Sequence, residues 1–233
     1  MVHIFIDLEM NQVSWSDSEA SGAVKNEIIQ IGAVKLDESY RVIDTYEAFV
    51  KPTYSKICPI CTRLTGITQE QADSGKSYPE AIVDFAEWAG TDACFYSWSD
   101  NDSRQLRHEA VCKKVDPAVI AVFDRWGDFQ LEYCNLVEQS RMGLDVALKG
   151  AGLFQIGAKH SAAADALSSV QLFKLVHSPV YFSEENRARI ILYTRIVRRR
   201  MQEKKQANKA RRTPKYPREQ HRQRQSRNHR TDI

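Results

Sequence analysis

The 233-residue sequence lacks any long hydrophobic run. Its uninterrupted apolar segments, such as residues 119–123, are far shorter than the roughly 20 residues that a membrane-spanning helix needs. The first residues, MVHIFIDLEM, also lack the basic region that opens a secretory signal peptide, and they reach acids at Asp7 and Glu9. Both absences argue against a membrane-bound or secreted protein, so we expect a cytoplasmic protein with no membrane partner.

Cysteine is scarce, and its number, five, is odd. A chain of this length does not need disulfides to hold a core, so we expect free thiols and a reducing compartment. Cys58 and Cys61 have the spacing of a metal-binding or redox pair, but no second pair of cysteines or histidines completes a tetrahedral site. The sequence therefore favours ordinary thiols at this motif.

Positive charge is scarce in most of the chain and concentrated at its end. Residues 1–194 hold 18 Lys and Arg against 27 Asp and Glu, a formal charge of −9, whereas residues 195–233 hold 15 against 3, a charge of +12. A basic extension on an acidic body is attracted to polyanions, of which nucleic acid is the first candidate and an anionic membrane surface the second. We therefore expect a nucleic acid partner whose phosphates the basic tail contacts. The alternative is a solvated end with no partner.

Hydrophobic patterning predicts a mixed α/β domain followed by a basic helix. The expected strands are residues 2–8, 27–36, 41–50 and 93–97, with a polar loop over 12–26 and a hairpin turn at Asp37-Glu38-Ser39. The expected helices are residues 79–88, 102–114, 127–139, 144–149, 161–176 and 183–201. Residues 1–178 should form the main domain and residues 179–201 a C-terminal helix, with residues 202–233 a flexible basic tail.

Two carboxylates stand at the end of the first expected strand. Because residues i and i+2 of a strand point to the same face, Asp7 and Glu9 project together. Neighbouring carboxylates repel each other and need a shared proton or a cation to offset the repulsion. Hard divalent cations such as Mg²⁺ prefer oxygen ligands of this kind. The pair therefore predicts a metal site at the end of this strand.

Further candidates stand where the fourth strand ends and where a later helix begins. Asp102 closes the segment SWSDND, in which Asp100, Asn101 or Asp102 is also a candidate cap of the following helix. His160 precedes a helix whose small residues allow close packing and which carries Asp165. A single histidine before a helix is most often a surface or capping residue, so its interest lies in the acids that accompany it.

By the order and spacing of seven segments, residues 1–178 resemble the DEDDh exonucleases, a group of DnaQ-like 3′→5′ exonucleases. Within this group the sequence is most similar to the KapD and Eri-type exoribonucleases. The segments are FIDLE, EIIQIGAVKL, FVKPT, CTRLTGIT, SWSDND, GLDVALKGAGL and KHSAAADA. The resemblance implies a ribonuclease H-like three-layer α/β fold with a central mixed five-stranded sheet. It also implies two Mg²⁺ or Mn²⁺ ions in each active site.

By this resemblance, Asp7, Glu9, Asp102 and Asp165 match the metal ligands and His160 the general base. Asp102 is preferred to Asp100 because it ends a W-x-x-x-D pattern. The chain departs from many relatives at Ser99, where they have Gly, and at Ala164, where they have Asp. The implied contacts to the 3′ end are Leu8, Met10, Asn11, Leu64 and Thr65, and Trp15 is a candidate for stacking on a base.

The sequence thus predicts a two-metal 3′→5′ exonuclease that acts on single-stranded nucleic acid, RNA favoured, and releases nucleoside 5′-monophosphates. A proofreading-like DNA exonuclease remains an alternative. So does an oligoribonuclease, because the opening DLEMNQ is also similar to that family. The alternative outside the enzymes is an inactive nuclease fold that binds nucleic acid through its basic tail.

Overall fold

The computed structural model describes residues 1–14 and 24–212, with side chains described as far as residue 209. Within these ranges one mixed sheet has the strand order β4-β3-β2-β1-β5-β6. The strands are β1 (Val2–Gln12), β2 (Asn26–Leu36), β3 (Val42–Lys51), β4 (Lys76–Ser77), β5 (Ala93–Ser97) and β6 (Trp126–Asp128). The sheet therefore has six strands where five were predicted, because the two-residue β4 adds to the edge of β3.

The three long strands form an antiparallel meander, and β5 and β6 extend the sheet in parallel beside β1. The predicted hairpin is confirmed: the Asp37 carboxylate accepts the backbone N–H groups of Ser39 and Arg41 in the turn. β1 is longer than predicted and continues through Gln12. Part of the predicted 12–26 loop, including Trp15, lies outside the described residues.

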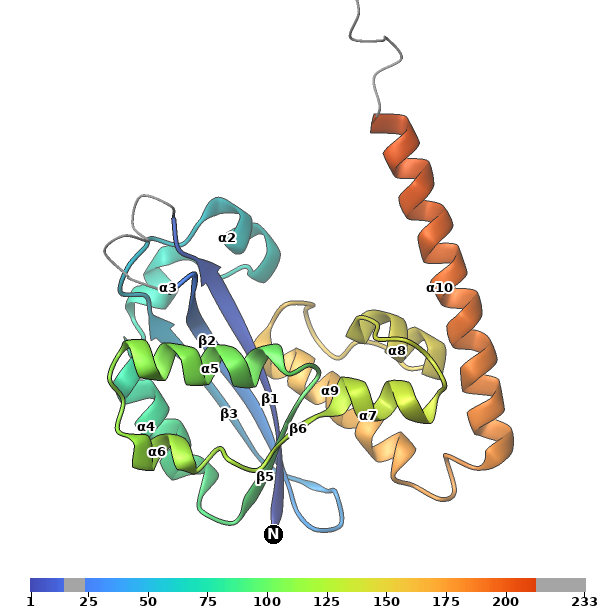
Figure 1. Ribbon diagram of the computed structural model, residues 1–233, viewed down its shortest axis with the longest axis horizontal. Coiled ribbons are helices and arrows are strands. Elements are labelled where there is room, and N and C mark those ends of the chain that lie inside the picture. The colour runs from blue at the N-terminus through green and yellow to red at the C-terminus, as the bar shows by residue number, and fades with distance from the viewer. Residues whose placement is uncertain (15–23, 213–233) are drawn as a thin grey trace, which may run out of the picture.

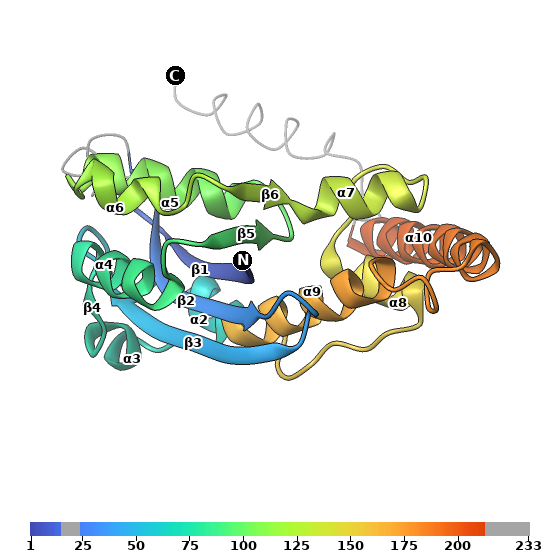
Figure 2. The same ribbon diagram turned by 90° about the horizontal axis from the view of Figure 1, so that it is seen from below.

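Helices cover both faces of the sheet, as Figures 1 and 2 show. The helices are α2 (Pro59–Thr65), α3 (Gln69–Asp73), α4 (Tyr78–Ala89), α5 (Asn101–Cys112), α6 (Pro117–Ala121), α7 (Phe129–Leu136), α8 (Leu144–Ala151), α9 (Ala162–Val176) and α10 (Glu184–Arg212). The sequence did not predict α2, α3 and α6, because segments of five to seven residues show no clear helical period.

Side chains of β1 alternate between two cores, as the period of a strand requires. Ile4 and Ile6 belong to a cluster that includes α4 and Phe123, and Phe5 belongs to a second cluster with Phe129 and α9. The central position of β1 explains why its residues are so fully buried. Side chains carried by β1 are consequently held in position by the two cores.

Helix α10 is longer than predicted. Ile190, Ile191 and Thr194 are buried, and a Cβ atom at Gly150 of α8 would lie only 2.1 Å from the Thr194 hydroxyl oxygen, so the two helices pack closely. Beyond residue 201 the helix continues to Arg212 and stands away from the body (Figure 1). This corrects the prediction of flexible chain from residue 202 on. Residues 202–212 consist mainly of Gln, Glu, Lys, Ala and Arg, which favour a helix even without apolar contacts.

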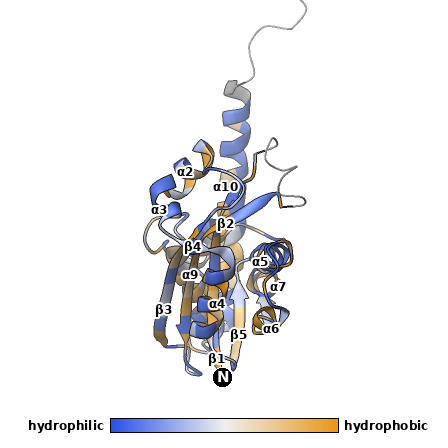
Figure 3. Ribbon diagram, turned by 90° about the vertical axis from the view of Figure 1, so that its left-hand side faces the viewer, coloured by the Kyte–Doolittle hydropathy of each residue, from blue (hydrophilic) through white to orange (hydrophobic). Residues whose placement is uncertain are grey.

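The protruding part of α10 is hydrophilic along its length, in contrast to the apolar interior of the sheet (Figure 3). Its described side chains from Gln202 to Lys209 are all exposed. In the described part of the chain, no helix is long and apolar enough to cross a bilayer. Residues 213–233, the rest of the predicted tail, lie outside the described ranges.

Candidate active site

The site begins where β5 stops pairing with β1. The parallel pairing ends at Ile6 and Ser97, so the β5 side of β1 is open from Asp7 onward. Helix α5 begins four residues after β5 and places Asp102 there, where its Oδ1 accepts the backbone N–H of Leu8 at 3.2 Å. A carboxylate thus occupies the position at which a longer β5 would have offered a carbonyl oxygen.

Asp102 and Asp100 have different surroundings. Asp102 is 8% exposed and bonds to β1, next to Asp7 and Glu9. Asp100 is more exposed and forms an ion pair with Arg104 one turn along α5. Asp102 therefore lies beside the acids of β1, whereas Asp100 pairs with Arg104.

Helix α9 brings Asp165 to β1 through close packing on β2. A Cβ atom at Gly32 would lie 2.1 Å from the backbone nitrogen of Ala163, so only glycine fits beneath the start of this helix. The Gln30 side chain accepts the backbone N–H of Ala162 at 3.2 Å from the same strand. The sequence indicated close approach through the small residues of α9, but it did not identify Gly32 or Gln30 as the residues that receive the helix.

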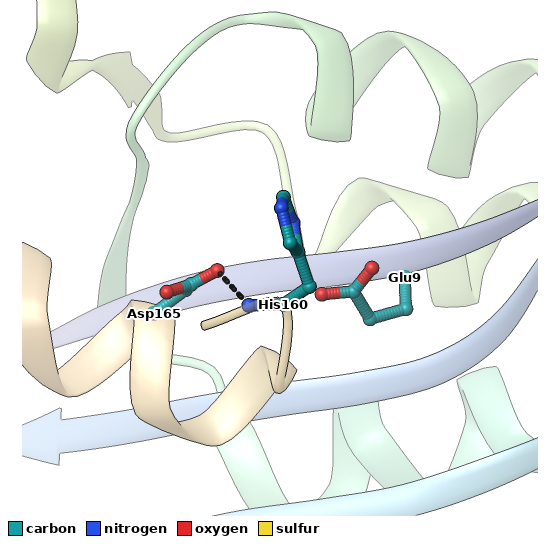
Figure 4. A group of neighbouring side chains, drawn as sticks. All are labelled: Glu9, His160 and Asp165. Carbon is teal, nitrogen blue, oxygen red and sulfur yellow. Dashed lines mark hydrogen bonds between the residues drawn. The ribbon is translucent and has the colours of Figure 1, made fainter. Parts of the chain in front are cut away.

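His160 lies in the loop before α9, with a backbone φ of 62°. Its backbone N–H donates to Asp165 Oδ2 at 3.1 Å, and the Gln155 amide donates to the other oxygen of Asp165. Ligand atoms of Glu9, His160 and Asp165 all lie within 4.8 Å of one another (Figure 4). The structure therefore brings the predicted histidine to the predicted acids.

Burial, together with repulsion from neighbouring charges, raises the pKa values of Asp7, Glu9 and Asp102. The pKa of Asp7 is raised well above its usual range by burial and by the charges of Asp102, Asp165 and Glu9. Burial, followed by the charges of Asp165 and Asp102, raises the pKa of Glu9 to about 7. Burial also raises the pKa of Asp102 to about 7, although the N–H bond from Leu8 opposes the shift. A cluster of this kind is fully ionised at neutral pH only when cations balance it.

The donor set fits divalent metal ions. Asp7, Glu9, Asp102 and Asp165 offer carboxylate oxygens, the ligands that Mg²⁺ and Mn²⁺ prefer, from β1, α5 and α9. The rise in pKa gives a physical reason for cation binding, because a bound cation stabilises the ionised forms.

The five residues predicted to contact substrate differ in accessibility. Leu64 on α2 is 55% exposed, whereas Leu8 is 6% exposed and Met10 packs partly against the core. The Thr65 hydroxyl donates to the carbonyl of Cys61 and accepts the N–H of Ile67. Leu64 therefore offers the largest free apolar surface of the set.

Asn11 requires a correction. Its side chain has no exposed surface, donates to the Lys56 carbonyl at 3.1 Å and accepts the Cys58 N–H at 2.8 Å. The amide group is thus occupied in holding the segment before α2 against β1. Its role is to position α2 rather than to contact the substrate directly.

A buried ionic cluster, which the sequence did not reveal, fixes the elements around the site. Lys113 Nζ lies 3.0 Å from Glu27 and 2.8 Å from Glu109. Glu27 also accepts the backbone N–H groups of Thr53, Tyr54 and Ser55, and Glu109 accepts that of Ile28. The cluster ties α5, β2 and the segment after β3 together. Glu27 is far from Glu109 and Lys113 in the sequence, so no local pattern pointed to the cluster.

Comparison with protein families gives one match over most of the chain. Residues 4–173 match the RNase T family model, described as exonuclease. ERI1 exoribonuclease 2 of Danio rerio is 28% identical over 193 residues, which cover 72% of this chain and 34% of the relative. The protein named probable 3′-5′ exonuclease KapD of Bacillus subtilis is 28% identical over 163 residues, which cover 68% of this chain and 77% of that protein. The chain therefore spans about a third of the first relative and about three quarters of the second.

Solved structures show the same fold. The nuclease domain of 3′hExo, a DEDDh family member bound to rAMP, superposes with a TM-score of 0.62 at 20% identity, covering 75% of this chain and 91% of that chain. Exonuclease I of E. coli in complex with a dT13 oligonucleotide superposes with a TM-score of 0.59 at 18% identity, covering 76% of this chain and 41% of that chain. The predicted ribonuclease H-like α/β fold is thus confirmed.

Proposed function

The chain belongs to the RNase T family of exonucleases, and from this premise we propose that it is a metal-dependent 3′→5′ exonuclease acting on single-stranded nucleic acid, with RNA preferred to DNA. One observation carries the proposal: ligand atoms of Glu9, His160 and Asp165 lie within 4.8 Å of one another, Asp102 bonds to the N–H of Leu8 between Asp7 and Glu9, and the charges of Glu9, Asp102 and Asp165 act on Asp7. Burial of so many acids weakens the fold unless they bind cations, so their convergence points to catalysis rather than to stability.

In this proposal Asp7, Glu9, Asp102 and Asp165 hold two Mg²⁺ or Mn²⁺ ions. Bound ions of this kind activate water and stabilise the charge that develops on the phosphate. Asp102 holds its position through the Leu8 N–H bond, and Asp165 through the N–H of His160 and the amide of Gln155. These bonds fix the carboxylates before any ion binds.

His160 is proposed as the general base. Imidazole is the side chain best suited to accept a proton near neutral pH. Its backbone is tied to Asp165, so its ring stands beside the acids that would bind the metal ions (Figure 4). Removal of a proton from water at this position leads to hydrolysis of the last phosphodiester and release of a nucleoside 5′-monophosphate.

Helix α2 supplies the proposed contact to the terminal nucleotide. Leu64 offers an exposed apolar surface. Thr65 and Met10 are linked through Cys61, whose carbonyl accepts the Thr65 hydroxyl and whose thiol donates to the Met10 carbonyl. Leu8, between Asp7 and Glu9, completes the proposed contact. An apolar contact of this kind suits an enzyme that removes any of the four nucleotides.

The test is an assay with single-stranded RNA and DNA of the same sequence, labelled at the 5′ or 3′ end, in Mg²⁺, Mn²⁺ or EDTA. We expect metal-dependent release of mononucleotides from the 3′ end, faster on RNA, and loss of this activity in Asp7→Asn. Tight binding without cleavage in either metal would overturn the proposal in favour of a nucleic-acid-binding protein. Faster cleavage of DNA would overturn the RNA preference alone.

The protruding part of α10 and the basic residues after it are proposed to hold the phosphates of longer substrates. The acidic body repels a nucleic acid strand, whereas residues 195–233 carry a formal charge of +12. Each phosphate neutralised releases counterions, which makes binding dependent on salt. A chain ending at residue 200 keeps Ile190, Ile191 and Thr194 docked on the body.

Deletion of residues 201–233 should therefore weaken binding of long substrates and flatten its salt dependence, while cleavage of very short oligomers is unchanged. Binding measured by fluorescence anisotropy at several salt concentrations gives the slope. An equal loss for short and long substrates would contradict this role of the extension.

A further inference from the structure

Cys58 and Cys61 lie on the first turn of α2, beside the strand that carries the acids. Cys58 is the N-cap of this helix: its carbonyl accepts the N–H of Thr62 at 3.1 Å, and its thiol accepts the N–H of Cys61 at 3.4 Å. In helical geometry the Cα atoms of residues i and i+3 are about 5 Å apart. Disulfides join Cα atoms separated by about 4.4–6.8 Å, so the backbone already suits a bond between these residues.

The two thiols have unequal access to solvent. Cys58 is half-buried and lines a hollow together with Lys56, Ser55 and Gln12. Cys61 is 5% exposed, donates its thiol to the Met10 carbonyl and packs in a small core cluster. A small disulfide therefore reaches the Cys58 thiol first, and the buried Cys61 thiol reacts second.

We propose that Cys58 and Cys61 are a redox pair whose disulfide changes the position of α2 on the active-site strand. The Cys58 thiolate attacks a small-molecule disulfide, displaces one thiolate and forms a mixed disulfide. Cys61 then loses its proton, attacks the Cys58 sulfur and displaces the second thiolate. The protein loses two electrons and two protons, and the small disulfide becomes two thiols.

Disulfide formation changes contacts that connect α2 to the site. The Cys61 sulfur leaves the carbonyl of Met10, which follows Glu9 directly. The N–H of Cys58 is bound to Asn11, and the carbonyl of Cys61 is bound to the Thr65 hydroxyl, so movement at either cysteine reaches β1 and the end of α2. This coupling rests on the proposed function, in which Leu64 and Thr65 contact the 3′ nucleotide.

The redox pair itself can be tested without any nuclease assay. The test uses the full chain with the other three cysteines replaced, Cys94→Ser, Cys112→Ser and Cys134→Ala. Oxidised glutathione should lower the mass of this intact protein by that of two hydrogen atoms and should protect both remaining thiols from alkylation. Dithiothreitol should reverse both changes. Cys61→Ser in the same background should instead retain one glutathione on Cys58. Persistent glutathionylation of the two-cysteine chain, or no reaction at Cys58, would overturn the redox pair.

The coupling is tested by rates on single-stranded RNA before and after oxidation. Oxidation should lower kcat/KM several-fold in the two-cysteine chain, with recovery in dithiothreitol and no change in Cys58→Ser. Serine is a matched control because it also caps a helix N-terminus. A disulfide without a change in rate would overturn the coupling to α2. A disulfide in a protein with no nuclease activity would contradict the proposed function and leave the redox pair standing.

Discussion

The two halves of the candidate site are held in different ways. On one side Asp7, Glu9 and Asp102 belong to the centre of the sheet and the helix beside it, and buried backbone fixes them. On the other side His160 and Asp165 depend on a loop with a left-handed residue and on side-chain bonds from Gln155 and Gln30. The sheet half is rigid and electrostatically strained, whereas the α9 half is assembled by contacts that single substitutions can remove. The two halves should therefore respond differently to mutation.

The largest effect should come from the sheet half. Asp102→Asn keeps an oxygen that accepts the Leu8 N–H but removes a charge, so activity should fall about 10³-fold, the scale of losing one charge-stabilising group. The metal-free protein should not lose stability, because the repulsion on Asp7 decreases. Rates and thermal unfolding in EDTA check both parts. The matched control is Asp100→Asn, which removes the same charge two residues away together with its ion pair with Arg104. Equal losses in the two variants would contradict the assignment of Asp102.

The second effect concerns pH. The folded pKa of Glu9 is raised from 4.5 to about 7, so its protonated form is favoured in the folded protein. In the metal-free protein, the contribution of Glu9 to the free energy of unfolding should be greatest below about pH 4.5. This contribution should fall by about 3 kcal/mol as the pH rises toward 7. Thermal melts in EDTA from pH 5 to pH 8 measure the decrease, and added Mg²⁺ should reverse it at pH 8. A metal-free protein whose stability rises over this range would contradict the strain assigned to the sheet half.

The third effect belongs to the packing of α9. Gly32→Ala places a methyl group against the helix backbone, which should cost about 2 kcal/mol and lower activity by moving Asp165. Gly127→Ala is a suitable control, because its Cβ would meet the Tyr96 ring at 3.1 Å and come no closer than 3.9 Å to the Phe95 carbonyl oxygen. Urea unfolding and kcat give the two measurements. Normal activity in Gly32→Ala would show that the α9 half tolerates displacement.

The smallest effect should come from one hydrogen bond in the α9 half. Gln155→Ala removes the amide that bonds to Asp165 and should lower activity about tenfold, with little change in stability. Gln171→Ala is the matched control, because this amide binds the Phe154 carbonyl of the same loop but not Asp165. Single-turnover rates separate the two variants. Similar losses in both would mean that the loop as a whole, rather than Asp165, responds.

The parts of the fold that the sequence predicted well are those with local signals. Alternating apolar residues gave the long strands, and Asp37 with its polar neighbours marked the hairpin turn. The five site residues were predicted because they stand near the ends of strands and the starts of helices, in an order similar to a known family. Their roles in catalysis remain proposals, but their convergence is observed.

What the sequence did not predict depends on distant contacts. Gly32 matters because α9 lies on it, and Glu27 because Lys113 reaches it from another element. Asn11 resembled a substrate contact, yet its amide is used within the fold. The length of α10 was underestimated for another reason: its polar residues were taken as a sign of flexibility, although they favour helix.

The difference in length between β1 and β5 has a consequence for how this domain can change. β1 has 11 residues and β5 has five, and the acids occupy the stretch of β1 that β5 does not reach. The acids thus lie where β1 has no parallel partner strand, and the Asp102 carboxylate accepts a backbone N–H of β1 in place of an interstrand hydrogen bond. Insertions that lengthen β5 by two or three residues would close this opening without altering any of the acids. Insertions in the hairpin turn after Leu36, at the far end of the sheet, would leave it intact.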